Sequence, residues 1–249
     1  MLDYDEEAER YDAARGGEPR AAAAARAVLG LLPDGTGTLL DVACGTGIVT
    51  RRLAAGRGAP RVTGVDLAAA MARQAASRLP GAIVRADCRR LPFRAGEFDA
   101  VSSVWLLHLA RSDADARAIV TECARVLRPG GVYVTTVDKA AAHNVGSDID
   151  AVLVSRPPHA AKDDEARVES YAVDCGLVPA GRACFPGRGQ GRSPRRTIAD
   201  LRRGWFLTLP PGEPLAEVFA ARLARLPDQD RPRPDPEFTL RAFRKQTAP

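Results

Sequence analysis

Aromatic side chains are scarce in this sequence. They make up 5% of the 249 residues, whereas apolar residues of all kinds make up 45%. Aliphatic side chains must therefore fill the core, and they are numerous enough for a folded domain rather than a disordered chain. The length fits one α/β domain with additions. The abundance of Ala, Arg, Gly and Pro is typical of high-GC bacterial genes.

Histidine and paired cysteine are also rare, which limits metal and disulfide chemistry. The chain has three histidines, too few and too scattered for a zinc site. Its five cysteines include no C-x-x-C pair, and an odd number leaves at least one thiol free. We therefore expect no bound metal and the reducing conditions of the cytoplasm.

Long apolar runs and a strong excess of one charge are missing as well. The apolar stretch over residues 21–32 is interrupted by Arg26 and is too short to span a bilayer. The acidic first residues do not resemble a signal peptide. The net charge of +5 is spread through the chain, with one dense basic stretch over residues 187–203. We expect a cytoplasmic protein, no membrane contact and no nucleic-acid partner.

The most informative stretch runs from Thr38 to Thr50 and reads TLLDVACGTGIVT. Its first half suits a strand that is buried on both faces, and its end begins a helix. Gly45 and Gly47 permit a tight turn and let a ligand lie directly against the backbone. The following helix points free N–H groups at such a ligand. The stretch therefore predicts a site for a small molecule.

Two further strands end in acidic residues. Asp66 follows the strand at 61–65, 21 residues after Gly45, the spacing at which a carboxylate meets a ribose. A carboxylate can accept from both ribose hydroxyls. Asp66 could equally cap the helix that follows. Asp87 ends the strand at 82–86 and is followed by Cys88.

These residues distinguish two kinds of site. A dinucleotide site expects the pattern G-x-G-x-x-G, but Thr50 stands in place of the third glycine. The segment 41–47, DVACGTG, places an acid before the glycines instead. It resembles the first motif of the class I S-adenosylmethionine (SAM)-dependent methyltransferases, small-molecule and bacterial in type. The stretches 91–93, 97–101 and 126–131 are also familiar in this family, so the resemblance covers residues 34–138.

The resemblance implies SAM as the cofactor, S-adenosylhomocysteine (SAH) as its product and no metal. Asp66 would then accept from the ribose, Asp87 from the adenine amino group, and the N–H of Cys88 would meet a ring nitrogen. The expected cofactor contacts are Tyr11, Asp41, Ala43, Cys44, Gly45, Gly47, Asp66, Leu67, Met71, Asp87, Cys88, Val104 and Trp105.

The fold expected from the pattern and the resemblance is α/β and Rossmann-like. It has a seven-stranded, mostly parallel sheet with helices on both faces. The strands are predicted at 38–42, 61–65, 82–86, 100–104, 132–137, 178–185 and 239–244, with the last antiparallel and ending the sheet. The helices are predicted at 4–11, 21–32, 46–55, 71–78, 113–127, 160–176, 197–207 and 215–226. We expect residues 1–33 to form an N-terminal helical cap on a core of 34–249, and 186–236 to be an insertion on the substrate side.

Candidates for chemistry on the acceptor are fewer. His108 lies in WLLHL, where the small-molecule branch of the family often reads Leu-His-His-Leu. His108 and His143 are candidate general bases, although each could instead be structural. Residues 103–106 lack the Asn- or Asp-Pro-Pro-aromatic motif of methyltransferases that act on base amino groups. The candidate substrate contacts are Tyr4, Asp138, Arg192 and Arg195.

The expected function is direct transfer of the SAM methyl group to an O, N or C atom of a small molecule, such as a bacterial secondary metabolite in antibiotic biosynthesis. One alternative is methylation of a peptide or RNA, which only the basic insertion supports. Another is a SAM-binding protein that uses the unreacted sulfonium for binding or cyclisation. A nicotinamide dehydrogenase is disfavoured by Thr50 and Asp87. The sequence leaves monomer and homodimer open.

Overall fold

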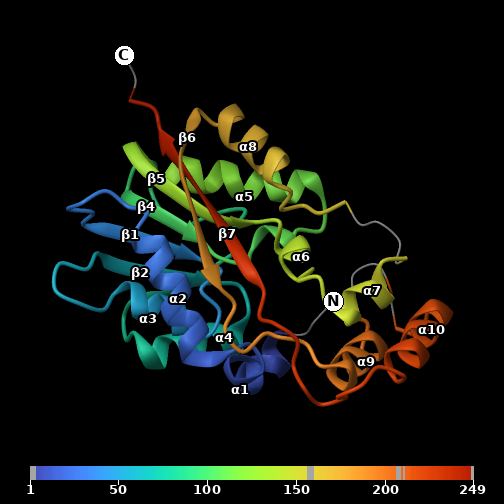
Figure 1. Cartoon of the computed structure of the whole chain (residues 1–249). Coiled ribbons are helices and arrows are strands. Elements are labelled where there is room, and N and C mark those ends of the chain that lie inside the picture. Colours follow the sequence, from blue (N-terminus) through green and yellow to red (C-terminus); the bar gives the residue numbers. More distant parts are fainter. Residues whose placement is uncertain (1–3, 156–159, 206–208, 210, 248–249) are drawn as a thin grey trace.

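The computed structural model describes residues 4–155, 160–205, 209 and 211–247. Within these residues the chain forms one seven-stranded sheet in the order β3-β2-β1-β4-β5-β7-β6 (Figure 1). The strands are β1 (Thr38–Val42), β2 (Arg61–Asp66), β3 (Ile83–Arg85), β4 (Phe98–Ser103), β5 (Leu127–Val137), β6 (Leu177–Pro186) and β7 (Glu237–Lys245). The predicted Rossmann-like class and the mostly parallel sheet are confirmed.

Helices cover both faces of the sheet. In chain order they are α1 (Tyr4–Ala14), α2 (Gly17–Leu29), α3 (Ile48–Leu53), α4 (Ala69–Arg78), α5 (Asp113–Val126), α6 (Lys139–Ala142), α7 (Asp148–Leu153), α8 (Glu165–Asp174), α9 (Pro194–Arg202) and α10 (Pro214–Leu223), with a short 3-10 turn η1 (Leu107–Leu109). Helices α5 and α8 pack on one face, and α2 and α3 on the other. The helices assigned by this structure include none long and apolar enough to cross a membrane.

Successive side chains of β5 point to opposite faces of the sheet, so this strand contributes to the hydrophobic core on each face. Tyr133 and Val137 face the α5 side, whereas Val132 and Val134 face the α2 side. All four side chains are essentially buried. Such a strand reads as a continuous apolar run because neither of its faces meets water.

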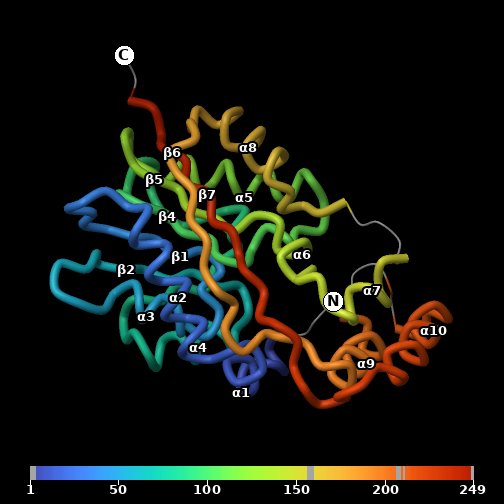
Figure 2. Tube along the Cα trace, in the orientation of Figure 1, coloured from blue at the N-terminus to red at the C-terminus, as the bar shows by residue number. Residues whose placement is uncertain are grey.

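One expectation about the last part of the sheet is wrong. Strand β7 does not end the sheet: it lies between β5 and β6 and runs antiparallel to both (Figures 1 and 2). Strand β5 begins earlier than predicted, at Leu127, which pairs with Phe98. The register then shifts before Ala100 pairs with Val132, so the two glycines of this segment lie in an irregular strand start.

Helix boundaries differ from the sequence prediction mainly where caps act. Helix α8 begins at Glu165 rather than near residue 160, because the Asp164 carboxylate accepts from the N–H of Arg167 as an N-cap. Helix α9 begins earlier than predicted, at Pro194, because Ser193 caps it in the same way. The segment after β5 was expected to be a loop but contains the short helices α6 and α7.

The segment between β6 and β7 forms a small cluster of helices with a core of its own. It begins after Pro186 and ends before Glu237. Its helices α9 and α10 lie beside α7, away from the sheet (Figure 1). Their shared core consists of Ile149, Leu153, Leu201, Leu209, Phe219 and Leu223. The ends of the segment are fastened together, since the Asp235 carboxylate accepts from the N–H groups of Gly189 and Gly191 at 3.1 and 2.7 Å.

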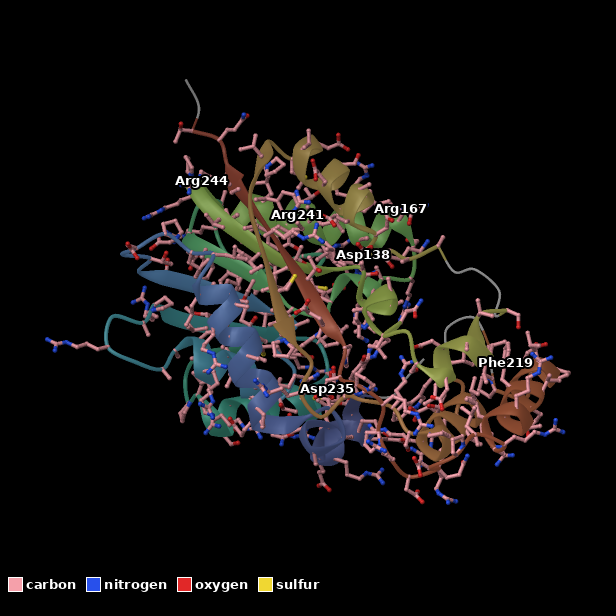
Figure 3. All side chains as sticks on the ribbon, in the orientation of Figure 1. Asp138, Arg167, Phe219, Asp235, Arg241 and Arg244 are labelled. Carbon is pink, nitrogen blue, oxygen red and sulfur yellow. The ribbon has the colours of Figure 1, made fainter. Side chains whose placement is uncertain are left out.

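This separate core predicts local rather than global unfolding when it is damaged. Phe219 is fully buried on α10 (Figure 3). Phe219→Ala should cost the cluster about 3–5 kcal/mol. We expect faster amide hydrogen exchange in α7, α9 and α10 while the strands keep their protection. Phe243→Ala, in the sheet core, is the control and should lower protection throughout. Equal loss of protection in the sheet of the Phe219 variant would contradict a separate cluster.

Candidate active site

The turn after β1 is joined to the end of β2 by a hydrogen bond from a backbone N–H to a side-chain carboxylate. The N–H of Gly45 donates to Asp66 Oδ2 at 2.8 Å, and the other carboxylate oxygen accepts from the N–H of Ala68 at 2.9 Å. Gly45 has φ +57°, and a Cβ placed on it would meet nothing within 4 Å. Asp66 thus both starts the turn before α4 and borders an open space beside the Gly45 backbone.

Gly47 has a different role from Gly45. A Cβ on Gly47 would lie 2.9 Å from both Cα and Cβ of Ala75 on α4, and its φ is +76°. Only a residue without a side chain allows α3 and α4 to approach this closely. The structure therefore explains Gly47 by helix packing, and its predicted contact with a cofactor stays a prediction.

Asp41 connects three elements beneath the turn. It is 3% exposed, and its two oxygens accept from Thr50 Oγ1 on α3 at 2.6 Å and from Ser102 Oγ on β4 at 2.7 Å. Burial raises the pKa of this carboxyl to about 6, although the two hydroxyl hydrogen bonds act in the opposite direction. With both oxygens engaged inside the protein, Asp41 acts here as a brace between β1, β4 and α3.

Helix α1 is fastened across the glycine turn. Asp12 accepts from Thr46 Oγ1 and pairs with Arg78, each at 2.6 Å, and Arg78 also donates to the Thr46 carbonyl. At the other end of α1, Asp5 accepts from the N–H of Ala70 at 2.6 Å. The N-terminal helix is thereby held against both α3 and α4.

Helix α1, which lies across the glycine turn, carries two tyrosines. The rings of Tyr4 and Tyr11 have centroids 6.1 Å apart. Burial raises the pKa of Tyr4 above its ordinary value, and the nearby Tyr11 and Asp66 add to that rise. Tyr4, predicted as a substrate contact, thus lies close enough to Asp66 to feel its charge.

The region where an adenine is predicted to bind is more open. Leu67 directly follows Asp66 and is 59% exposed. Asp87 is half-buried and is engaged by Arg89, which also pairs with Asp115 and lowers the pKa of Asp87. Met71, in contrast, is fully buried in α4. Cys44 is buried as well, against Gly64 of β2.

Trp105 lies where β4 ends. Its backbone has φ +59°, and its N–H donates to Thr136 Oγ1 at 2.7 Å. The indole ring meets Phe185 and Phe238 edge-on at 5.6 Å each, and the guanidinium of Arg20 lies 4.1 Å from its centroid. The indole nitrogen is buried with no hydrogen-bond partner among the described residues. Val104, the preceding residue, is buried.

His108 and Lys139 form a half-buried pair just after the ends of β4 and β5. Their Nε2 and Nζ atoms are 2.9 Å apart. Burial, with Arg15 next in effect, lowers the pKa of Lys139 to about 7. Burial also lowers the pKa of His108 well below its ordinary value, and the charge of Lys139 adds to this shift. The pair therefore combines two nitrogen bases in a site that disfavours positive charge.

The remaining candidates are distributed unevenly. His143 packs edge-on against Phe238 at 5.6 Å and lines a cavity of about 10 Å³ together with Arg192. Asp138 (Figure 3) has φ +51°, and its carboxylate accepts from the N–H of Glu165, so it anchors the start of α8. Arg195 is 67% exposed and pairs with Asp230 within the insertion.

The structure thus brings some predicted residues together and leaves others apart. Asp66, Gly45 and Tyr4 lie together at the glycine turn. His108 instead pairs with Lys139, which directly follows β5. Arg195 joins neither group. Sequence reasoning missed Lys139 as the partner of His108, and it missed Arg20. A charged residue at the head of an alanine-rich apolar helix was the available signal for Arg20.

Comparisons with known proteins agree with this geometry. Residues 40–135 match the family model described as a methyltransferase domain. An uncharacterized chloroplastic methyltransferase of Arabidopsis thaliana is 37% identical over 110 residues, which are 40% of this chain and 30% of that protein. The chain spans about a third of the length of the first curated relatives it matches.

Two solved structures resemble almost the whole chain. One is a chain of the Haloferax volcanii complex between a methyltransferase activator and a methyltransferase, with a TM-score of 0.62, 18% identity, and coverage of 99% of this chain and 100% of that one. The other is the 4+2 cyclase SpnF, with a TM-score of 0.62, 20% identity, and coverage of 98% and 94%. At these identities both matches establish the fold alone.

The sheet order, the glycine turn and the acid at the end of β2 define a Rossmann-like methyltransferase fold. The match of residues 40–135 to a methyltransferase-domain model agrees with the motif resemblance to the class I SAM-dependent methyltransferases.

The residues at the turn fit the cofactor that this fold implies. The space beside Gly45 admits a ligand against the backbone, Asp66 offers a carboxylate at its border, and the exposed Leu67 offers an apolar surface for a flat ring. Among the residues that the structure describes, no group of His, Cys, Asp and Glu is arranged to hold a metal ion.

The two glycines should respond differently to the same substitution. Gly47→Ala should destabilise the fold, since the Cβ meets Ala75 and the left-handed backbone adds about 1–2 kcal/mol. Gly45→Ala should cost only that backbone term but should weaken SAH binding about tenfold or more, because its Cβ enters the space that the ligand needs. Urea unfolding and calorimetric titration with SAH measure the two effects. Identical losses of stability would contradict the distinction.

Asp41 should make stability depend on pH. Its pKa is about 6 in the folded protein against an ordinary 3.8, so the folded state holds the extra proton between these values. The stability it contributes is fully present below about pH 4 and is lost as the pH rises through 6, by up to about 3 kcal/mol.

Asp41→Asn cannot titrate and should not show this loss, whereas Asp34→Asn, in an exposed loop, should retain it. Urea unfolding at pH 4 to 7 provides the measurement. A loss of the same size in the Asp41 variant would assign the pH dependence to another group.

Proposed function

We propose that the chain transfers the methyl group of SAM to an O, N or C atom of a small molecule by direct displacement and releases SAH. The observation that carries this proposal is the open space beside Gly45, bordered by the Asp66 carboxylate. The family match over residues 40–135 supports the same reaction. We also propose that the acceptor belongs to bacterial secondary metabolism and that the reaction takes place in the cytoplasm. The acceptor and its reacting atom are part of the same proposal.

Each part of the proposed site has a distinct task. Asp66 retains lone pairs beyond those used by Gly45 and Ala68 and would accept from the ribose hydroxyls. Leu67 would pack against the adenine ring, and Asp87 would accept from its amino group. When bound, the cofactor supplies a methyl group already activated by the sulfonium. The protein therefore needs to hold the acceptor in line rather than to activate the donor.

The acceptor would lie beyond Trp105, toward the ends of β4 and β5. The rings of Trp105, Phe185 and Phe238 pack together here with centroids 5.6 Å apart and would form an apolar wall for the acceptor. Holding two reactants in line can supply several kcal/mol of the barrier. A base is needed only when the acceptor arrives protonated, and His108 and His143 are the candidates. Burial and the charge of Lys139 keep His108 neutral, but the lowered pKa also makes it a weaker base than a free imidazole.

Loss of the Asp66 charge should weaken cofactor binding. Asp66→Asn keeps an oxygen for the N–H of Gly45 but accepts less well from two hydroxyls, so SAH affinity should fall about tenfold. Asp34→Asn should leave the affinity unchanged. Titration calorimetry with SAH measures both. Failure of the folded wild-type protein to bind either SAM or SAH would overturn the proposed function.

Product analysis separates methyl transfer from the alternatives. Incubation with SAM and candidate small molecules should yield SAH and a product heavier by one methylene unit. A product without added methyl, formed while SAM persists, would identify a protein that uses the cofactor for binding or cyclisation. Methylation of a peptide, or of RNA with a steep dependence of binding on salt, would replace the small-molecule acceptor.

A further inference from the structure

Positive side chains gather in the protein interior beside Trp105. They come from the turn between α1 and α2, from α2, from η1 and from α6. We call Arg15, Arg20, His108 and Lys139 the cationic cluster. Arg20 is 4% exposed, and Lys139 and His108 are half-buried. Arg15 and Arg20 both lower the pKa of Lys139, and Arg15 also lowers that of His108, so the four groups repel one another.

Three carboxylates face the cluster, and each also binds other groups. Asp12 acts on Arg20 but bonds Thr46 and Arg78. Asp163 Oδ2 accepts from the backbone N–H of Lys139 at 2.9 Å, so it holds the start of α6. Asp200 on α9 faces Arg15 but also Arg192, Arg196 and Arg203. Buried charges without close partners are costly. An anion placed among the four side chains would relieve their repulsion.

Three nitrogen groups at the cluster are buried without a hydrogen-bond partner in the described part of the chain. They are Nε of Arg20, Nε1 of Trp105 and Nδ1 of His108. The first two can only donate a proton, and Nδ1 can donate in one tautomer. Buried donors without acceptors are rare in native proteins, and each is costly. The oxygens of a carboxylate would supply acceptors that also match the charge.

We propose that the cationic cluster binds the carboxylate of an acidic methyl acceptor, with Lys139 and Arg20 as its partners and His108 holding Lys139 in place. This inference rests on the proposed function. Arg15 and Arg20 belong to the N-terminal helices, whereas His108 and Lys139 follow β4 and β5. A bound carboxylate would therefore join the helical cover to the edge of the sheet.

Direct binding of a neutral and an acidic probe tests the proposal. Benzoate and benzamide have nearly the same shape but differ in charge. Titration calorimetry on the SAH-saturated protein should show benzoate binding at least about tenfold more tightly than benzamide. Lys139→Met should remove this preference. Lys245→Met, which removes the same charge where Lys245 donates to the Ala124 and Leu127 carbonyls, should keep it. Equal affinities of wild-type protein for the two probes would overturn the proposal.

Stability and pH give independent readouts on the same variants. Lys139→Met removes a half-buried cation and should leave the midpoint of thermal unfolding unchanged or higher, so lost binding cannot be ascribed to misfolding. The benzoate preference should weaken from pH 7 to pH 9, as Lys139 loses its proton. The charged and titratable groups that face Lys139 are Arg15, Arg20, His108, Asp163 and Arg192. A preference that does not change with pH would exclude Lys139 as the partner.

SAM also carries a carboxylate, and the SAH affinity of the variants separates the two sources. If the cluster serves the acceptor, Lys139→Met should change SAH affinity by less than about twofold. A loss of about tenfold would assign the cluster to the cofactor and overturn the proposal while leaving methyl transfer intact. If the wild-type protein does not bind SAH at all, the proposed function fails, and the comparison of benzoate with benzamide can still be made on the protein alone.

Discussion

The hydrogen bond from the Gly45 N–H to Asp66 connects the two turns on which the site depends. It holds the carboxyl end of β2 against the turn after β1, while the second oxygen of Asp66 starts the turn before α4. Because Gly47 lets α4 pack closely on α3, the same small region also fixes the helices on this face. Because each oxygen of Asp66 accepts from a backbone N–H, the position of this carboxylate is fixed by the two turns. The open space beside Gly45 is a consequence of this arrangement, since the backbone itself forms its floor.

The N-terminal helices depend on that region in turn. Asp12 binds both Thr46 and Arg78, so the cover is attached to the turn and to α4 together. Exposed ion pairs contribute little, but this one is mostly shielded, with side-chain exposures of 17 and 24%, and it shares a network with the Thr46 carbonyl. The cover brings Arg15 and Arg20 to the ends of β4 and β5. The same docking that covers the glycine turn therefore brings Arg15 and Arg20 into the cationic cluster.

The sequence predicts what local spacing determines. The interval from Gly45 to Asp66 follows from one strand-helix-strand unit, which predicted an acid at the end of the second strand but not its hydrogen bond to Gly45. The place of β7 between β5 and β6 depends on long-range pairing that residues 239–244 do not encode by themselves. The pairing of Lys139 with His108 was not predicted, because it requires η1 and the segment after β5 to come together in the fold. Asp41 was expected at the cofactor, but its partners Thr50 and Ser102 become visible only when β1, α3 and β4 are in place.

Electrostatics divides the site into two halves with opposite character. At the glycine turn the carboxylate that borders the open space is Asp66, since Asp41 has both oxygens engaged inside the protein and Arg78 is paired with Asp12. Beyond Trp105 cationic side chains predominate, although Asp163 and Asp200 also face them, and one lysine has a pKa of about 7. A cationic methyl donor and an anionic acceptor would each be attracted to its own half and repelled by the other. Trp105 separates the halves, with its ring against Arg20 and its backbone tied to Thr136. Discrimination between the two ligands thus follows from the sign of the buried charge on each side of one indole ring.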